Sequence, residues 1–253
     1  MELFDSSPPR KERHPHTPLA DKMRPLILDE FVGQRHLLAP GKLLRELGEG
    51  GRLHSLILWG PPGCGKTTLA RLLAGASGAQ CIKFSAVSSG VKELKKIIEE
   101  AQRLYRLSIP MVLLVDEIHH FNKTQQDTFL PHIENGVLIL IGATTENPSF
   151  EVISPLLSRC QVLVLHPLST EEIGKIIGRA LTDPKKGLGA SGLELATDGR
   201  EFLIQESRGD ARTALNALET AATLALRGKG EKIIGLSFLQ EALQKKPLLY
   251  DKG

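Results

Sequence analysis

Apolar residues gather into short runs along the middle of the chain and alternate there with stretches of helical period. Five runs rich in Val, Ile and Leu predict strands that are buried on both faces, at residues 55–59, 80–84, 111–115, 137–141 and 162–165. Between the second and third runs, apolar residues recur at steps of three and four from Val91 to Leu104, which predicts an amphipathic helix. This alternation predicts an α/β domain with a mostly parallel sheet covered by helices on both faces.

The pattern changes after Pro167, where the strand-like runs stop and helical patterns follow one another. Ser169 lies three residues before Glu172, the spacing of a capping box at a helix start, and Asp210 is a second expected N-cap. We therefore expect an α/β domain over residues 18–167 and a small all-helical lid domain over residues 168–246.

The two ends of the chain carry no such pattern. Residues 1–17 combine prolines with mixed charges, a composition that cannot repay the entropy of ordering, so we expect a flexible tail. Residues 247–253 are expected to form a second, short tail.

Composition and charge exclude several classes of protein but do not indicate a binding partner. Hydrophobic residues make up 41% and charged residues 24%, which is typical of a globular chain and excludes extensive disorder. Lys and Arg number 32 against 29 Asp and Glu, so charge alone neither favours nor excludes nucleic acid. The three scattered cysteines fit neither a disulfide framework nor a zinc site. No apolar run approaches the roughly 20 residues of a membrane span, so we expect a cytoplasmic protein without a membrane partner.

The strongest chemical signal fits the pattern GxxxxGK[ST] and lies between a predicted strand and a predicted helix. It is the segment Gly60-Pro61-Pro62-Gly63-Cys64-Gly65-Lys66-Thr67, followed by Thr68. Glycines let such a loop wrap a phosphate with its own N–H groups, and the dipole of the following helix favours the negative charge. Lys66 is expected to reach the β- and γ-phosphates of a nucleotide, and the Thr67 hydroxyl to ligate Mg²⁺.

A second signal is the apolar run from Met111 to Val115, which ends in Asp116 and Glu117. Acidic strand ends are also common as solvated surface, but ligands of open α/β sheets bind at the carboxyl ends of the strands. Downstream of a phosphate loop, this pattern favours Asp116 as a ligand of Mg²⁺ and Glu117 as the residue that polarises an attacking water.

The apolar run at residues 137–141 leads into a threonine-rich segment. A polar side chain at this strand end is expected to meet the γ-phosphate or the water, and Thr145 is our choice, although a simple turn is the alternative. Arg159 and Arg212 are isolated arginines, which are usually solvated surface charges, and spacing alone assigns neither of them a role.

Taken together, the phosphate loop, the Asp-Glu strand end, the Ser-Arg-Cys before the last strand and the helical lid resemble an AAA+ ATPase. The segments 116–132 and 142–150 resemble more narrowly the replication-associated recombination protein A family of bacteria, which is related to the eukaryotic Werner-helicase-interacting ATPase. Pro18-Leu19-Ala20, Met23-Arg24-Pro25 and Val32-Gly33-Gln34 resemble the same family.

The resemblance implies hydrolysis of ATP to ADP and phosphate with Mg²⁺. It makes Arg159 the finger that a neighbouring subunit inserts at the γ-phosphate, and Arg212 the lid arginine that senses this phosphate within one subunit. Backbone around Val32 and Gly33 would receive the adenine. His120 stands where the family usually has arginine, so a role for that arginine does not carry over.

The resemblance also implies partners. They are DNA, at forks and at junctions of single and double strands, and single-stranded-DNA-binding protein, with a nucleoid-associated location. The family forms homo-oligomers through a C-terminal helical region that this chain would lack. A clamp-loader subunit, a branch-migration motor and a nucleotide-dependent scaffold with little turnover are the alternatives.

Overall fold

The computed structural model describes residues 17–85, 91–227 and 232–244 and divides the chain into two compact units. Pro25–His166 form the first unit, and residues 17–24 join residues 167–244 in the second. No helix in these described ranges is long and apolar enough to cross a membrane.

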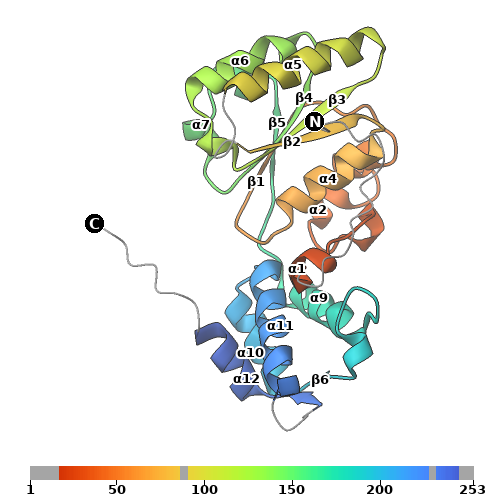
Figure 1. The fold of residues 1–253 in the computed structure, drawn as a ribbon, viewed down its shortest axis with the longest axis vertical. Coiled ribbons are helices and arrows are strands. Elements are labelled where there is room, and N and C mark those ends of the chain that lie inside the picture. The colour runs from red at the N-terminus through yellow and green to blue at the C-terminus, as the bar shows by residue number, and fades with distance from the viewer. Residues whose placement is uncertain (1–16, 86–90, 228–231, 245–253) are drawn as a thin grey trace, which may run out of the picture. The chain divides into compact units, whose positions relative to one another are not determined.

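The first unit is built on a parallel sheet of five strands in the order β2-β3-β4-β1-β5 (Figure 1). The strands in chain order are β1 (Leu56–Trp59), β2 (Gln80–Ser85), β3 (Met111–Asp116), β4 (Ile139–Thr144) and β5 (Gln161–Val164). The carboxyl ends lie at one edge of the sheet, since Trp59 of β1 pairs with Thr144 of β4 and Asp116 of β3 with Ala143.

Helices cover both faces of this sheet, as the sequence predicts. One core cluster joins strand residues to α4 (Lys66–Ala76) and α3 (Leu43–Gly48), and another joins them to α5 (Val91–Arg106) and α6 (Lys123–Glu134). Val112 and Leu114 of β3 belong to the first cluster, whereas Leu113 and Val115 belong to the second. This alternation explains why the strand reads as a continuous apolar run.

Short helices complete the first unit. They are η1 (Leu28–Glu30), α2 (Arg35–Leu38), η2 (Ile118–His120), α7 (Pro148–Glu151) and α8 (Ser154–Leu157).

Strand β4 differs from its predicted range, because it begins at Ile139 and continues to Thr144 rather than ending at Ile141. Leu138 closes a turn after α6 with its amide on the His132 carbonyl, 3.0 Å away. Gly142 and Ala143 extend the strand, but small residues carry little strand signal. The strand therefore ends at Thr144.

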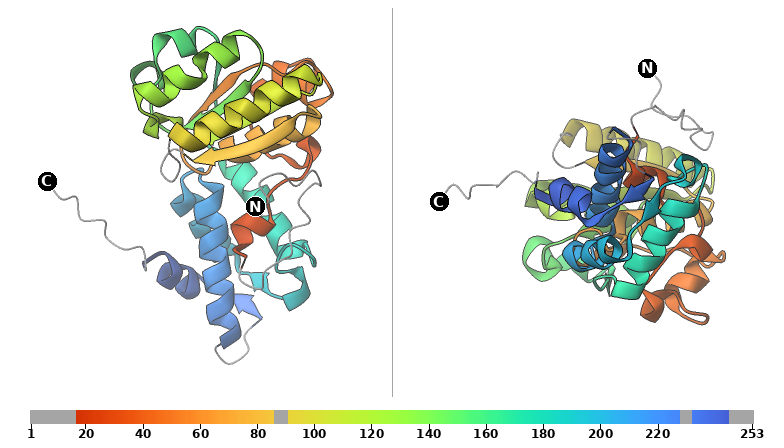
Figure 2. Two further views of the ribbon diagram at one scale, coloured as in Figure 1. Left: turned by 45° about the horizontal axis from the view of Figure 1, so that its top comes forward. Right: turned by 90° about the horizontal axis from the view of Figure 1, so that it is seen from below.

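The second unit is a helical domain around one long helix. It contains α9 (Thr170–Thr182), η3 (Gly189–Ser191), α10 (Thr197–Ser207), α11 (Ala211–Arg227) and α12 (Leu236–Gln244). Helix α11 packs against α9, α10 and α12 (Figure 2). A two-residue parallel pair, β6 (Glu194–Leu195) with β7 (Ile233–Ile234), adds to the helices that the sequence predicts. The capping box of Ser169 with Glu172 and the Asp210 cap are both present.

The division of the chain differs from the expected one at residues 18–24 and at Pro167, which all belong to the helical unit. Helix α1 (Leu19–Lys22) groups with the helical unit rather than with the α/β domain. Leu19 is buried in the core of that unit, and its amide donates to Glu219 Oε2 at 2.9 Å. Four residues are too few to show a helical period, so the sequence gives no signal for this docking. The expected tails at residues 1–17 and 247–253 lie outside the described residues, except for Thr17.

Candidate functional site

The phosphate loop lies between β1 and α4, as the sequence predicts, and its glycines are required by its shape. A Cβ at Gly60 would lie 2.4 Å from the Leu165 carbonyl oxygen, so a side chain there would collide with the backbone directly after β5. Gly63 and Gly65 have positive φ values of 65° and 102°, a region that favours glycine. The loop therefore presents its backbone at the start of α4, where amide groups point toward an anion.

Lys66 is the first residue of α4 and is almost completely buried, with 7% of its surface exposed. Its Nζ donates to the carbonyl oxygens of Gly60 and Pro61, both at 2.8 Å. Within the described ranges, no carboxylate forms an ion pair with this lysine. A buried ammonium group that meets only carbonyl oxygens provides an uncompensated positive charge, which suits it to bind an anionic group such as a nucleotide phosphate.

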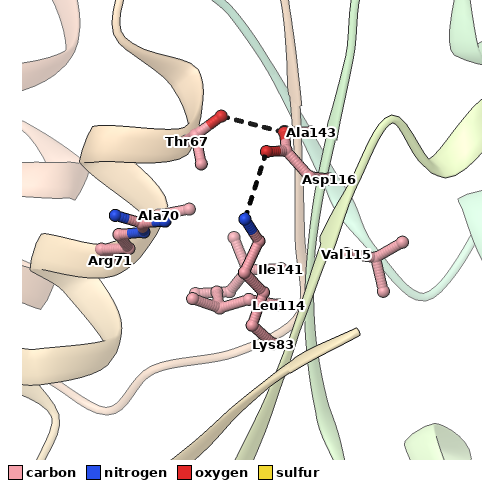
Figure 3. Close-up of a pocket in the computed structure, with 9 residues that line it drawn as sticks. All are labelled: Thr67, Ala70, Arg71, Lys83, Leu114, Val115, Asp116, Ile141 and Ala143. Atoms are coloured by element: carbon pink, nitrogen blue, oxygen red, sulfur yellow. Dashed lines mark hydrogen bonds and ion pairs between the residues drawn. The ribbon is translucent and has the colours of Figure 1, made fainter. Parts of the chain in front are cut away.

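Thr67 and Asp116 meet across the sheet edge, as expected for the two predicted ligands of Mg²⁺. Thr67 Oγ1 donates to Asp116 Oδ1 at 2.9 Å, and both side chains line a small pocket with Ala143 (Figure 3). A hydroxyl and a carboxylate oxygen are ligands that Mg²⁺ accepts, with water and phosphate completing its shell. The donor set therefore fits this ion. The described part of the chain contains no group of three or more His, Cys, Asp or Glu side chains that could hold a metal ion.

Lys83 is a member of this pocket that the sequence did not predict. It lies on β2, and its Nζ is 4.0 Å from Asp116 Oδ2, in the ion pair drawn in Figure 3. The pairing of β2 with β3, which places Ser85 beside Asp116, brings it there. The sequence contains no sign of that pairing, because the strand order arises only when the sheet forms.

Glu117 follows β3 in a left-handed conformation with φ 53°. Its Oε2 is buried and has no hydrogen-bond partner within the described residues, although the side chain as a whole is 41% exposed. The nearest basic group is His119, whose Nδ1 lies 3.3 Å from Oε2. The same Nδ1 is 3.0 Å from Thr144 Oγ1. The sequence predicts no function for His119 or Thr144, because 25 residues separate them and their contact forms only in the folded chain.

Thr145 follows the end of β4 and is half-buried. The preceding Thr144 is fully buried, and its hydroxyl accepts a hydrogen bond from the Glu146 amide at 3.0 Å. Thr144 is thus fixed within the turn, whereas Thr145 is the residue of this pair that reaches partial exposure. Its predicted role at the γ-phosphate stays a prediction.

The segment predicted to receive adenine approaches the phosphate loop through its neighbour Phe31. A Cβ on Gly65 would be 2.6 Å from the Phe31 ring, so the two segments are in close contact. Gly33 has a φ of 91°. Gln34, with φ 52°, is buried and bonds both backbone groups of His166, donating to its oxygen at 2.7 Å and accepting from its amide at 2.9 Å. These two bonds tie the backbone of Val32 and Gly33 to the end of β5.

Arg159 of the first unit has its described partners outside the phosphate loop. Arg159 is exposed after α8, donates to Pro155 O and Ser158 Oγ at 2.7 and 2.8 Å, and pairs with Glu134 of α6 at 2.6 Å. Arg212 is exposed on α11 of the second unit. The roles of Arg159 as the finger for a neighbouring subunit and of Arg212 as the lid arginine that senses the γ-phosphate stay predictions.

Comparisons with known proteins agree with this geometry. Residues 56–168 match the ATPase family associated with various cellular activities (AAA), and residues 189–253 match the AAA C-terminal domain. Replication-associated recombination protein A from Haemophilus influenzae and from Escherichia coli K12 are each 46% identical over 235 residues. These matches cover 93% and 92% of this chain and 53% of each relative, so the chain spans about half the length of these relatives.

More distant relatives show the same pattern. The ATPase WRNIP1 of Dictyostelium discoideum is 39% identical over 252 residues, which cover 93% of this chain and 29% of that protein. The solved structure of the Thermotoga maritima RuvB Holliday junction branch migration motor has a TM-score of 0.70 and 27% identity. It covers 88% of this chain and 72% of its own.

Proposed function

The chain belongs to the AAA+ ATPases of the replication-associated recombination protein A family, and we propose on this premise that it hydrolyses ATP to ADP and phosphate at the phosphate loop. The observation that carries the proposal is the buried Lys66 ammonium, whose partners among the described residues are two carbonyl oxygens, together with the contact of Thr67 with Asp116. A buried cation and two oxygen ligands at the carboxyl ends of the strands are what a nucleoside triphosphate with Mg²⁺ requires.

Each predicted residue has a role in this proposal. The backbone from Gly60 to Thr68 and the Lys66 ammonium bind the phosphates, and the backbone of Val32 and Gly33 receives the adenine. Thr67 and Asp116 hold Mg²⁺, which when bound would neutralise charge on the transferring phosphoryl group.

The reaction itself needs a positioned water. The Glu117 carboxylate follows the Asp116 strand end and is partly exposed, so it orients and polarises that water, while Thr145 contacts the water or the γ-phosphate. These residues act mainly by position and charge, because phosphoryl transfer requires little covalent chemistry from the protein.

We also propose that turnover depends on assembly into a homo-oligomer. An arginine supplied by a neighbouring subunit accelerates related phosphoryl transfers by roughly 10³ to 10⁵. Arg159 is exposed, as a residue that serves a neighbouring site must be, and Arg212 of the helical unit would sense the phosphate within one subunit. The rate per subunit should then rise with protein concentration.

DNA is the proposed partner of this ATPase, at forks and at junctions of single and double strands, together with single-stranded-DNA-binding protein. The support is the naming of the relatives for replication-associated recombination and of RuvB for branch migration. A cytoplasmic, nucleoid-associated location follows from the same proposal. The likeness to RuvB favours a branch-migration motor as the second candidate, which a four-way junction substrate would distinguish from a forked one.

Steady-state phosphate release tests the proposal. We expect the wild type to hydrolyse ATP with a rate that rises with protein concentration and with forked DNA, and Glu117→Gln to bind ATP with equal affinity but to release almost no phosphate. Equal, slow rates for both proteins, with and without DNA and despite tight ATP binding, would instead establish a nucleotide-dependent scaffold.

A further inference from the structure

His119 lies between the carboxylate proposed to polarise water and the end of the strand that precedes Thr145. It belongs to the short helix η2, and only 15% of its side chain is exposed. Its Nδ1 faces two oxygen atoms, Thr144 Oγ1 at 3.0 Å and Glu117 Oε2 at 3.3 Å. One ring nitrogen therefore connects β3 to β4 at the point where the proposed reaction takes place.

The chemistry of the two oxygens determines which nitrogen of His119 carries hydrogen. With hydrogen only on Nε2, the lone pair of Nδ1 would face the negatively charged Glu117 Oε2, which is repulsive. With hydrogen on Nδ1, both neighbouring oxygens are acceptors and the contact is attractive. The carboxylate therefore favours the form with an Nδ1–H group, whether the ring is neutral or charged.

Thr144 has the capacity to accept this hydrogen. Its hydroxyl oxygen already accepts from the Glu146 amide at 3.0 Å, and its own hydrogen has the Glu146 carbonyl as an acceptor at 3.3 Å. A hydroxyl oxygen accepts two hydrogen bonds, so one position is open for His119. In this structure Nδ1–H lies nearer to Thr144, and Glu117 Oε2 has no hydrogen bond within the described residues.

The backbone of Glu117 leaves the extended conformation of β3, so its side chain does not continue the alternation of side chains along the strand. A left-handed φ at a residue other than glycine is held by its surroundings, and such strain is typical of positions where a side chain must point in one direction. Because Oε2 is buried while the side chain is partly exposed, one oxygen faces the protein and the exposed surface lies on the remaining atoms.

We propose that His119 is a positioning residue for Glu117: its Nδ1–H bonds Thr144 Oγ1 and, 3.3 Å from Glu117 Oε2, attracts this carboxylate oxygen to the protein side and leaves the other for water. This inference rests on the proposed ATP hydrolysis and adds to it a connection from the end of β4 to Glu117.

Two substitutions of His119 separate this role from simple packing. The amide nitrogen of His119→Asn takes the place of Nδ1, whereas that of His119→Gln takes the place of Nε2. Thr144→Ser keeps the hydroxyl and Thr144→Val removes it at nearly equal volume. His54 is exposed and contacts Gln161 at the first residue of β5, at the other edge of the sheet, so His54→Gln serves as the matched control.

The experiment measures kcat and KM for ATP hydrolysis, the dissociation constant of a fluorescent ATP analogue, and the melting temperature of each variant. We expect His119→Gln to lower kcat by roughly 10- to 100-fold, the effect of a displaced catalytic group, with KM and nucleotide affinity within twofold of wild type. His119→Asn and Thr144→Ser should restore most of kcat. Thr144→Val should lower it, and its combination with His119→Gln should cost no more than His119→Gln alone.

Several results would overturn the inference. They are a kcat for His119→Gln equal to that of His119→Asn, a loss of nucleotide affinity that accounts for the lower rate, or additive losses in the double variant. A wild type that binds ATP but never hydrolyses it, alone or with DNA, would overturn the proposed function and this inference with it. An active wild type with unaffected His119 variants would overturn the inference alone.

Discussion

The buried Lys66 should contribute strongly to nucleotide binding but little to the stability of the nucleotide-free protein, so one substitution can test both expectations. Moving an ammonium group out of water costs several kcal/mol, and the two hydrogen bonds to Gly60 and Pro61 return about 1.5–3 kcal/mol each. The two effects nearly cancel. Buried ion pairs replaced by apolar side chains of similar volume are often neutral or stabilising by about 1–4 kcal/mol, and a buried ammonium group without a carboxylate partner has still less electrostatic energy to lose.

The perturbation is Lys66→Met. Without nucleotide, the melting temperature of the variant should equal or exceed that of wild type, by about 3 °C for each kcal/mol gained in a unit of this size. With Mg²⁺ and ADP at 100 times the dissociation constant, the wild type should gain about 2.7 kcal/mol, or about 8 °C, and the variant nothing.

Differential scanning fluorimetry of both proteins, with and without nucleotide, measures all four values. Lys95→Met is the matched control, because Lys95 is exposed on α5, and it should keep the full nucleotide shift. Two results would refute the reasoning about Lys66. They are a nucleotide-free variant that melts more than about 5 °C below wild type, or a variant that retains the nucleotide shift.

Three further predictions concern single contacts. Gln34→Glu replaces the amide group that donates to the His166 carbonyl oxygen by a carboxylate oxygen. It should lower the free energy of unfolding in urea by about 2–3 kcal/mol and weaken ATP binding. Unchanged values would contradict the role of this contact. Gly60→Ala forces a Cβ against the Leu165 oxygen and should cost about 1–3 kcal/mol by the same measurement, while a neutral effect would show that the loop can shift. Burial raises the pKa of Cys160 to about 12, so at pH 8 only about one thiol in 10⁴ is ionised. Mass spectrometry should therefore find Cys160 unmodified by iodoacetamide until urea is added. Rapid labelling of Cys160 in the folded protein would contradict this expectation.

Much of the first unit could be predicted from the sequence, because its strands are buried on both faces and therefore read as apolar runs. Four of the five runs match strands to within one residue at each end, and the phosphate loop lies between a strand and a helix as expected. The contact of Thr67 with Asp116 joins two motifs that were predicted separately. Local patterns are sufficient where burial and turn chemistry decide the structure.

The remaining features arise from contacts between distant segments. The place of Lys83 beside Asp116 depends on strand order, and the left-handed Gln34 is accompanied by its two bonds to the backbone of His166. The docking of α1 depends on the buried Leu19 and on its amide bond to Glu219. None of these leaves a periodic signal in the sequence. His119 is the clearest case, because a histidine after an acidic pair shows nothing of Thr144 until β3 and β4 are paired.

Small residues at the end of β4 explain how Thr67, which follows β1, meets Asp116, the last residue of β3. Strand β4 lies between β1 and β3, so neighbouring strands about 4.8 Å apart place β1 and β3 about 10 Å apart. Ala143 of β4 lines the same pocket as Thr67 and Asp116, and its short side chain leaves the space above the strand to theirs. Gly142, on the opposite face, has Ile118 so close that a Cβ would lie 2.9 Å from its Cδ1. The residues that weakened the strand signal are therefore the ones that let both faces of the sheet edge close around the proposed site.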